Sequence, residues 1–418
     1  MADLFIGLFL GILLSAPVPV FAAFSNYNSV LLGERAAGMG GAFTALTGDP
    51  AATPFYNPAT TILMPGTNLS AAVSVYNKYA INYGEENQAG GVPQQVNQGF
   101  FRSLPTSSGT ILNFGSFAAG LSIVKPDYEF FSGQVQGTDT INSTLNYTDE
   151  SLWVGPTFSA RLTDRDRIGL TLYYTSRDLT RTISDRLTTG GGTGATITIE
   201  EKDLTANAIV SVLGYQRQLT DTWAVGISYR PPSLPIGSEA SFYESTTQTT
   251  PYSTTVINQG GVSAVAKIPS RIAIGVAREV KGVNTLSADI QVYEGLSYQD
   301  VSLPAGAEQE NYNQVWNFAV GYEQIVADWL TLRLGVYSNR SSHPEPTLES
   351  GLRQGDHLDM NGFSTNVKLR LPSGTSFTIG GYYTAGDGQA TEFTGGKLVL
   401  VPKSEQVFTM LVATGFQF

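Results

Sequence analysis

The stretch VFTMLVATGFQF, residues 407–418, decides the fold of this chain. Its side chains alternate between two faces, and one face carries Phe408, Met410, Val412, Phe416 and Phe418, with Thr414 as its one polar residue. Strict alternation over this length predicts a β-strand that is apolar on one side. A strand long enough to cross a membrane needs about 9 to 11 residues, and this one is long enough.

The same pattern recurs along the chain. In residues 167–175, Ile168, Leu170 and Leu172 face one way, and Gly169 and Thr171 face the other. Residues 223–230, 330–336 and 363–371 alternate in the same manner, and their second face carries arginine or lysine. A charged side chain on the lipid face would cost about 2 to 4 kcal/mol near mid-membrane, so the charged face is predicted to line the lumen.

Alternation and turn signals together predict an all-β, antiparallel transmembrane β-barrel of about fourteen strands, with twelve as an alternative. The predicted strands are 67–77, 111–124, 127–137, 148–162, 166–182, 201–218, 222–245, 259–279, 283–300, 310–326, 328–340, 356–371, 375–386 and 403–418. Short turns, such as the one predicted at Lys125-Pro126-Asp127, alternate with long polar loops, such as 78–110. A large soluble β-sandwich also alternates, but its strands are usually shorter.

Composition agrees with a barrel and narrows the function. Only 14% of the 418 residues are charged, against about a quarter in an ordinary soluble protein. The mean hydropathy of −0.03 argues against a helical membrane protein. The net charge of −11 makes nucleic acid an unsuitable partner, because phosphate binding requires clustered lysine and arginine. The chain has no cysteine, which excludes disulfides and thiolate metal sites.

The first 22 residues are predicted to be a signal peptide. The apolar run from Leu4 to Leu14 has the length of a signal-peptide core, and small residues after it allow cleavage after Ala22 or Ala23. The segment before the run is atypical, since it holds Asp3 and no lysine or arginine, so the true translation start could lie elsewhere. A retained membrane anchor is the alternative, but the run is too short to span a bilayer.

Residues 23–66 do not alternate and are rich in Gly, Ala and Pro. They precede a barrel, residues 67–418, whose lumen water would fill unless something plugged it. We therefore predict that residues 23–66 form a plug inside the lumen. A disordered periplasmic tail is the alternative, although such tails are usually more charged and less apolar than this segment.

This segment carries a recognisable pattern. Gly33-Glu34-Arg35-Ala36-Ala37-Gly38-Met39-Gly40-Gly41-Ala42-Phe43 is followed by Gly48-Asp49-Pro50-Ala51-Ala52-Thr53 and by Tyr56-Asn57-Pro58-Ala59. It resembles the N-terminal hatch of the FadL/TodX family, outer-membrane channels for long-chain fatty acids and other hydrophobic molecules. The resemblance covers motifs over residues 23–66 and architecture over the rest. It implies a fourteen-strand barrel and passive, facilitated uptake gated by the hatch.

The resemblance also implies roles for individual residues. Asn57, Pro58 and Ala59 correspond to the hatch motif, and Gly38, Gly40 and Gly41 to its flexible part. The candidates for contact with the ligand are Phe24, next to the cleavage site, and Phe100, Phe101 and Leu104 in an expected outer loop. A kink in the third strand would offer a side exit into the membrane, and Gly133 is the candidate for that kink.

The resemblance further implies that the protein lies in the bacterial outer membrane. It also implies a monomer that is in contact with lipid and lipopolysaccharide. The terminal aromatics Phe416 and Phe418 resemble the signal that the barrel assembly machinery reads. No nucleic acid, cofactor or metal is expected. The sequence does not decide which hydrophobic molecule is the cargo.

Two other functions are compatible with a barrel. A porin for polar solutes could use lumen-facing charges, which are expected at Arg230, Arg271, Glu323, Arg333, Lys368 and Arg370. The same charges could instead pair with a hatch. An outer-membrane lipid hydrolase would need a nucleophile beside a histidine, and neither His343 nor His357 lies in such a context. We therefore expect no catalytic residues.

Overall fold

The computed structural model describes residues 25–84, 94–137, 141–189, 194–299, 309–349, 354–394 and 397–418. Three short helices come first: α2 (Arg35–Gly38), α3 (Thr53–Tyr56) and the 3-10 helix η1 (Pro58–Leu63). The strands follow: β1 (Thr67–Tyr83), β2 (Gln94–Asn113), β3 (Phe117–Gly137), β4 (Ile141–Arg161), β5 (Asp166–Thr189), β6 (Gly194–Gln218), β7 (Trp223–Arg230), β8 (Leu234–Thr249), β9 (Tyr252–Ser263), β10 (Arg271–Val280), β11 (Asn284–Tyr293), β12 (Leu296–Gln299), β13 (Gln309–Tyr312), β14 (Val315–Ala327), β15 (Leu330–Asn339), β16 (His357–Arg370), β17 (Thr375–Thr394) and β18 (Lys397–Gln417). Among the described residues, no helix is long and apolar enough to cross a membrane.

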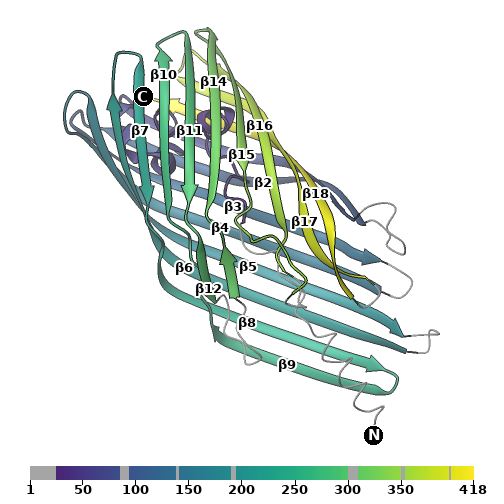
Figure 1. Ribbon diagram of the computed structural model, residues 1–418. Coiled ribbons are helices and arrows are strands. Elements are labelled where there is room, and N and C mark those ends of the chain that lie inside the picture. The colour runs from purple at the N-terminus through teal and green to yellow at the C-terminus, as the bar shows by residue number, and fades with distance from the viewer. Residues whose placement is uncertain are drawn as a thin grey trace.

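The strands form one closed antiparallel barrel (Figure 1). β18 pairs with β1, and the Thr67 and Phe418 backbones exchange hydrogen bonds of 3.2 and 2.9 Å at the seam. β5 pairs with both β4 and β6, which closes the ring at fourteen strands, with β8 and β9 branching from β6. The predicted count of fourteen is therefore confirmed, and a soluble sandwich is excluded because the sheet has closed on itself.

Two of the predicted strands were placed wrongly. β3 runs through the residues predicted as a turn, Lys125-Pro126-Asp127, and the turn lies instead at residues 114–116. β2 occupies residues 94–113, most of which was expected to be a loop. Proline usually signals a turn because it lacks a backbone N–H, and it is tolerated in a strand that has no neighbour to receive that donor.

The two faces of the wall differ as the alternation predicts. In β10, Ile272, Ile274 and Val276 are exposed on the outside, and Arg271 and Ala273 are buried on the inside. At the end of the chain, Phe408 and Val412 face outward, and Leu411 and Ala413 face inward. Outward apolar and inward polar or small side chains suit a wall with lipid on one side.

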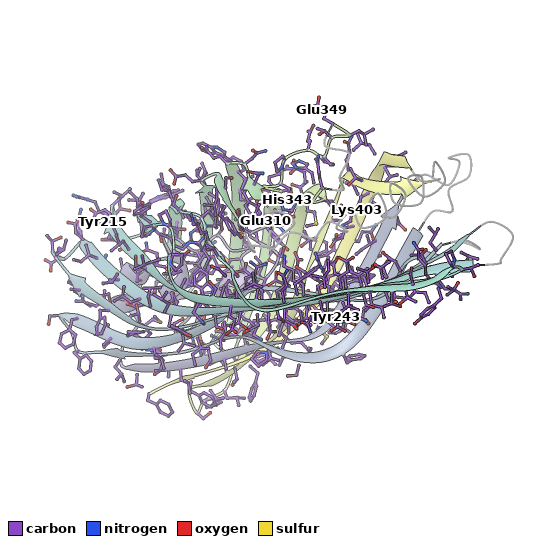
Figure 2. All side chains as sticks on the ribbon, turned by 90° about the horizontal axis from the view of Figure 1, so that it is seen from below. Tyr215, Tyr243, Glu310, His343, Glu349 and Lys403 are labelled. Atoms are coloured by element: carbon purple, nitrogen blue, oxygen red, sulfur yellow. The ribbon has the colours of Figure 1, made fainter. Side chains whose placement is uncertain are left out.

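Two strands of the ring are interrupted. β7 continues into β8 after Pro231-Pro232-Ser233, and β9 continues into β10 after residues 264–270. β8 pairs with the part of β6 that lies far from the short turns, and β9 lies on the other side of β8. In Figure 2, Tyr215 marks the end of β6 near the short turns, and Tyr243 marks β8. β9 pairs with β8, whereas β12 pairs only with β13 in a separate small sheet.

The N-terminal segment, residues 25–66, lies within the ring of strands near the end that carries the short turns (Figure 1). Its apolar side chains pack against inward residues of the wall: Phe43 and Phe55 share a buried cluster with Trp153 and Tyr173. Leu31 and Ala42 belong to a second cluster with residues of β14 to β18. The interior core of this protein is therefore built between the wall and its own N-terminal segment.

Candidate functional site

A network of charges attaches the N-terminal segment to β14–β17. The Arg35 guanidinium donates to Glu323 through Nε (3.1 Å) and Nη2 (2.7 Å), and Arg333 Nε donates to the same carboxylate at 2.6 Å. The Glu34 carboxylate accepts hydrogen bonds from Lys368 Nζ and, at 2.6 Å, from Thr378 Oγ1. Two of the lumen charges expected from the sequence, Glu323 and Lys368, thus pair with this segment, and Arg333 joins the network through the shared Glu323 carboxylate.

The Glu34 pairing persists over the physiological pH range. Burial alone would raise the pKa of the Glu34 carboxyl, but the charges of Lys368 and Arg333 outweigh it and lower that pKa from 4.5 to about 2. A carboxyl whose pKa is lowered by folding stabilises the protein at pH values above its ordinary pKa, and this contribution is lost only as the pH falls toward 2. The attachment is therefore intact at neutral pH.

Asn57 joins the segment to the opposite wall. Its side-chain amide donates to the carbonyl oxygens of Thr44 (2.7 Å) and Tyr215 in β6 (3.0 Å). Its carbonyl oxygen accepts from the Ala59 backbone N–H at 3.1 Å, which caps η1. Pro58 occupies the first position of η1, where a backbone N–H would have no partner within the helix, so the absence of this donor in proline costs no hydrogen bond. The three residues of the motif therefore form one buried, capped turn held against β6.

Glycines of the wall make room for this turn. Gly169 in β5 and Gly214 in β6 lie opposite each other, and both face the Asn57-Pro58-Ala59 motif. A Cβ atom on Gly214 would lie 2.1 Å from Asn57 Oδ1, and one on Gly169 would lie 2.4 Å from the Pro58 carbonyl carbon. The segment can approach the wall this closely only because these positions carry no side chain.

We expect Gly214→Ala to displace the N-terminal segment while the barrel still folds. The added methyl group overlaps Asn57, and overpacking of this kind costs about 1 to 3 kcal/mol. Limited proteolysis should then cleave within residues 25–66 faster than in the unchanged protein. Gly237→Ala in β8 is the matched control, because a Cβ atom there meets nothing within 4 Å. Equal cleavage of the two variants would show that the motif does not depend on this contact.

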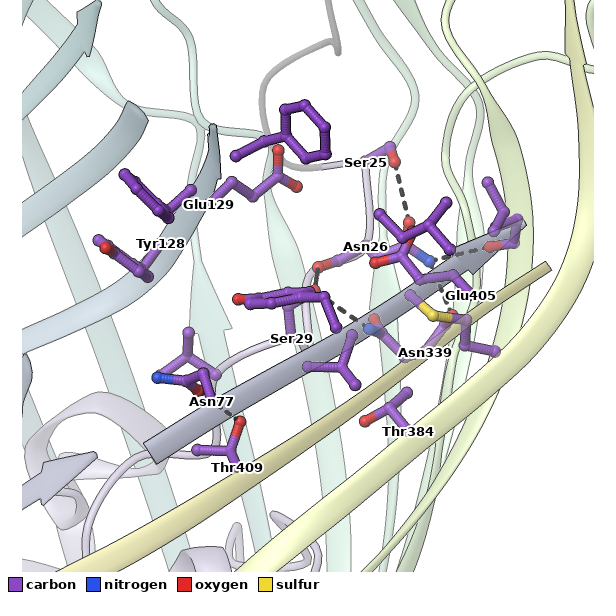
Figure 3. A pocket seen from close by; sticks show the side chains of 18 of the residues that line it. Ser25, Asn26, Ser29, Asn77, Tyr128, Glu129, Asn339, Thr384, Glu405 and Thr409 are labelled. Atoms are coloured by element: carbon purple, nitrogen blue, oxygen red, sulfur yellow. Dashed lines mark hydrogen bonds between the residues drawn. The ribbon is translucent and has the colours of Figure 1, made fainter. Parts of the chain in front are cut away.

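A cavity, here called the first cavity, lies between the start of the N-terminal segment and the wall. Its volume is about 1270 Å³, its open mouth included, and Ser25, Asn26, Ser29 and Val30 line it from one side. Leu104, Phe130, Phe131 and Met360 are among its apolar lining residues. In Figure 3, Tyr128 and Glu129 of β3 face Asn339, Thr384 and Glu405 across this space. A mostly apolar cavity with a few polar groups is the usual form of a site for a small hydrophobic ligand.

The start of the segment is fastened beside this cavity. Asn26 donates to the carbonyl oxygens of Asn339 (2.8 Å) and Leu358 (3.0 Å). Asn28 donates to the Asn339 side chain at 2.9 Å and to the Ser338 carbonyl at 3.1 Å. These bonds make residues 25–30 part of the cavity wall, so any shift of the segment changes the shape of the cavity.

The cavity borders an unpaired stretch of the barrel wall. β2 and β3 pair only from Ser107–Asn113 to Ala118–Val124. Farther from the short turns, residues 94–106 keep their pairing with β1, and residues 127–137 keep theirs with β4. Across these described stretches no backbone pairing joins β2 to β3. We call this stretch the β2–β3 slot, and residues on both its edges, such as Leu104 and Phe130, line the first cavity.

Prolines mark the point where the slot begins. Pro105 lies in β2 and Pro126 in β3, close to the last pair, Ser107 and Val124. Neither proline can donate a backbone hydrogen bond across the sheet, so the ladder ends there at low cost. The β3–β4 register also shifts between Val124 and Asp127. Gly133 pairs with Leu145, and a second register shift follows between Gln134 and Gln136, so a kink at Gly133 stays a prediction.

Of the predicted ligand-contacting residues, only some lie where the prediction placed them. Leu104 lines the first cavity, on β2 rather than in a loop. Phe101 is 85% exposed and contacts Tyr76 with a ring-centroid distance of 4.8 Å, so it lies outside the cavity. Phe24 and the side chain of Phe100 fall outside the described residues. Cavity residues on β3, such as Tyr128 and Phe130, were missed because their surroundings were assigned to a short strand after a turn.

The predicted flexible glycines are closely packed in this structure. Gly40 and Gly41 have φ values of +66° and +81°, which favour glycine. A Cβ atom on Gly38 would lie 2.4 Å from the Asn366 amide, and one on Gly40 would lie 3.1 Å from the Val336 backbone. Their observed role is close approach to β15 and β16.

The two histidines bond to backbone carbonyls. His343 Nδ1 lies 3.0 Å from the Asp356 oxygen, and the His343 ring stacks on Tyr312. Burial lowers the pKa of His343, which lies in the loop after β15. Among the described residues, no group of three or more His, Asp or Glu side chains could hold a metal ion.

The fold and the outward apolar face define a bacterial outer-membrane β-barrel protein. No protein-family model matches the sequence, and no curated protein matches it. Solved structures do match. A FadL homologue of Pseudomonas aeruginosa has a TM-score of 0.67 and 15% identity, covering 94% of this chain and 100% of that chain. The toluene transporter TodX of P. putida has a TM-score of 0.66 and 14% identity, covering 93% and 98%.

A third structure, the CymD monoaromatic hydrocarbon channel, has a TM-score of 0.61 and 14% identity and covers 94% of this chain and 99% of that chain. The second and third are described as a transporter and a channel, and the similarity to each of the three extends over nearly the whole chain. The predicted resemblance to the FadL/TodX family is thus confirmed in the fold: this chain has the fold of the FadL/TodX channels.

Proposed function

We propose that this protein is a channel for passive, facilitated uptake of hydrophobic molecules across the outer membrane, and that residues 23–66 act as its hatch. The observation that carries this proposal is the position of the first cavity. It lies between the start of the hatch and the β2–β3 slot, and apolar and polar side chains line it together. A ligand in this cavity would have the hatch on one side and a break in the wall on the other.

The cargo class follows from the lining and from the related folds. Structures with the same fold are described as a toluene transporter and a monoaromatic hydrocarbon channel. Long-chain fatty acids or similar lipophilic compounds would suit an amphipathic cavity that holds Glu129, Lys403 and Glu405 beside apolar side chains. Movement down a gradient through the slot into the membrane requires no energy source.

A porin for polar solutes is less well supported. Its pore would need free charges in the lumen, whereas Glu323 pairs with Arg35 of the hatch and with Arg333, and Lys368 pairs with Glu34 of the hatch. Arg271 donates to the Phe55 carbonyl of the hatch at 3.0 Å, and Arg370 is exposed. We also infer that the protein is not a hydrolase, because among the described residues neither histidine ring bonds to a serine, threonine or asparagine side chain that could act as a nucleophile.

Two measurements test the proposed function. In bacterial cells whose own hydrophobic uptake channel has been deleted, expression of this protein should increase uptake of labelled oleate or toluene above the background rate. In proteoliposomes, sugar-driven swelling should stay at the rate of protein-free liposomes, because the hatch closes the aqueous path. Rapid swelling without faster hydrophobic uptake would support the porin and contradict the channel.

A further inference from the structure

A second cavity lies among aromatic side chains, between Pro126 and Asp127 of β3 and residues 266–269. It encloses about 770 Å³, its open mouth included. Six aromatic side chains line it: Tyr27, Phe55, Trp153, Tyr293, Tyr298 and Tyr312. Tyr27 stacks on Tyr293 with a centroid distance of 4.3 Å, and Phe55 lies 5.6 Å from Trp153. Walls of this kind favour a flat ring, which can take offset or edge-on positions against them.

One buried cation in this cavity has no carboxylate partner. Arg230 is 5% exposed, and its guanidinium lies over the rings of Trp153 (5.4 Å) and Tyr293 (5.7 Å). Nη2 donates to the Pro269 carbonyl at 3.2 Å, but Nε has no hydrogen-bond partner among the described residues. The indole N–H of Trp153, which is 1% exposed, also has none within that part of the chain.

Among the described residues, no charged group of the cavity forms an ion pair with Arg230, although Asp127 interacts with it at longer range. Asp127 accepts from Ser151 Oγ at 2.8 Å and forms no ion pair with Arg230 among the described residues. Arg177 is paired with Asp149 through two hydrogen bonds of 2.9 and 2.7 Å. Lys267 is exposed. Directly across the β7–β10 ladder from Arg230 lies a second buried cation, Arg271, which adds to the positive potential.

A buried, unpaired cation is costly unless an anion or several acceptors compensate it. Arginine pairs with carboxylates through parallel N–H donors, which is among the strongest of the polar contacts in proteins. Resting on the proposed function, we propose that the second cavity binds an aromatic carboxylate. Its ring packs against the aromatic walls, and its carboxylate accepts from Arg230 and from the indole N–H of Trp153.

This assignment separates the cargo from two neighbouring classes. An aromatic hydrocarbon would fill the same walls but leave the Arg230 and Trp153 donors unpaired. A linear fatty acid would satisfy the donors but gain nothing from ring-to-ring packing. Only a molecule with both a ring and an anionic group satisfies the two features that the cavity combines.

Equilibrium dialysis against the full-length protein in lipid nanodiscs tests the proposal, with empty nanodiscs as the blank. The probes are naphthalene-2-carboxylate, naphthalene-2-methanol and dodecanoate. The carboxylate should bind about tenfold more tightly than the alcohol, the contribution of one charge-assisted pair. Arg230→Gln and Arg230→Met should remove this difference by lowering carboxylate binding to the level of alcohol binding. Arg217→Gln, at an exposed arginine outside the cavity, is the matched control and should retain it.

The other possible outcomes of this experiment contradict either the proposed ligand of the second cavity or the proposed function. Equal binding of the naphthalene carboxylate and alcohol to the unchanged protein, or a preference that survives Arg230→Gln, overturns the anion site. Tighter binding of dodecanoate than of the naphthalene carboxylate overturns the aromatic part. In these cases some probes still bind, so the proposed channel stands. If none of the three probes binds, the proposed function itself fails.

Discussion

Cross-linking Ser103→Cys in β2 to Lys125→Cys in β3 is expected to reduce uptake of hydrophobic cargo to the background rate. Ser103 is exposed, and neither residue lines the first cavity, so the bridge spans the β2–β3 slot without filling the cavity. If cargo leaves through the slot, tying its edges together removes the exit. Bifunctional thiol reagents of increasing span make the bridge, and the chain has no other cysteine to react.

The reduced form of the same double variant is the first control and should take up cargo normally. A second pair, Leu112→Cys with Ala119→Cys, joins residues that already face each other in the β2–β3 ladder. Cross-linking this pair should leave uptake unchanged. Unimpaired uptake with the bridge across the slot would show that cargo leaves by another route, such as past the hatch into the periplasm.

Glu323→Gln is expected to loosen the hatch and open an aqueous path. The Glu323 carboxylate holds both Arg35 of the hatch and Arg333 of β15. Removing its charge leaves two buried guanidinium groups without their counter-ion, and breaking a buried pair in this way costs about 3 to 5 kcal/mol. Because the backbone pairing of β14 does not involve this side chain, the barrel should still form. Sugar-driven swelling of proteoliposomes should therefore become measurably faster.

Glu279→Gln is the matched control for this variant. Glu279 Oε1 lies 3.9 Å from Nη2 of Arg35, but the Glu279 side chain is 47% exposed. An exposed pair of this kind contributes about 0 to 1 kcal/mol, so swelling should not change. Heat-dependent migration on gels would verify that both barrels are folded. A folded Glu323→Gln barrel that excludes sugar as well as the unchanged protein does would mean that other contacts hold the hatch.

The Asn57-Pro58-Ala59 motif shows how much of the candidate site could be predicted from local sequence. Its turn chemistry is local, because Asn57 caps the helix that Pro58 begins. The sequence did not reveal its partner in the wall, the Tyr215 carbonyl 158 residues away. Glu34 and Arg35 lay inside the recognised pattern, yet their roles were missed because a charge shows its function only beside its partner.

The slot could not be located from sequence for a different reason. Residues 94–113 are polar and contain Pro105, so they carry no clear strand alternation, and Pro126 suggested a turn. At both prolines β2 and β3 are not paired with each other, although Pro105 still pairs with Val73 of β1. The feature that confused the strand assignment is thus the feature that ends the β2–β3 ladder.

By itself, the sequence determined the transmembrane barrel, its total of about fourteen strands and, outside the misplaced β2 and β3, the face of the strands that meets lipid. The terminal stretch Val407–Phe418 was sufficient to begin that argument, because alternation along a strand is a property of neighbouring residues. Only the tertiary structure decided where the wall is left unpaired, which charges hold the hatch, and that Arg230 lacks a carboxylate. These features depend on which distant segments lie side by side, and closure of the ring sets that arrangement.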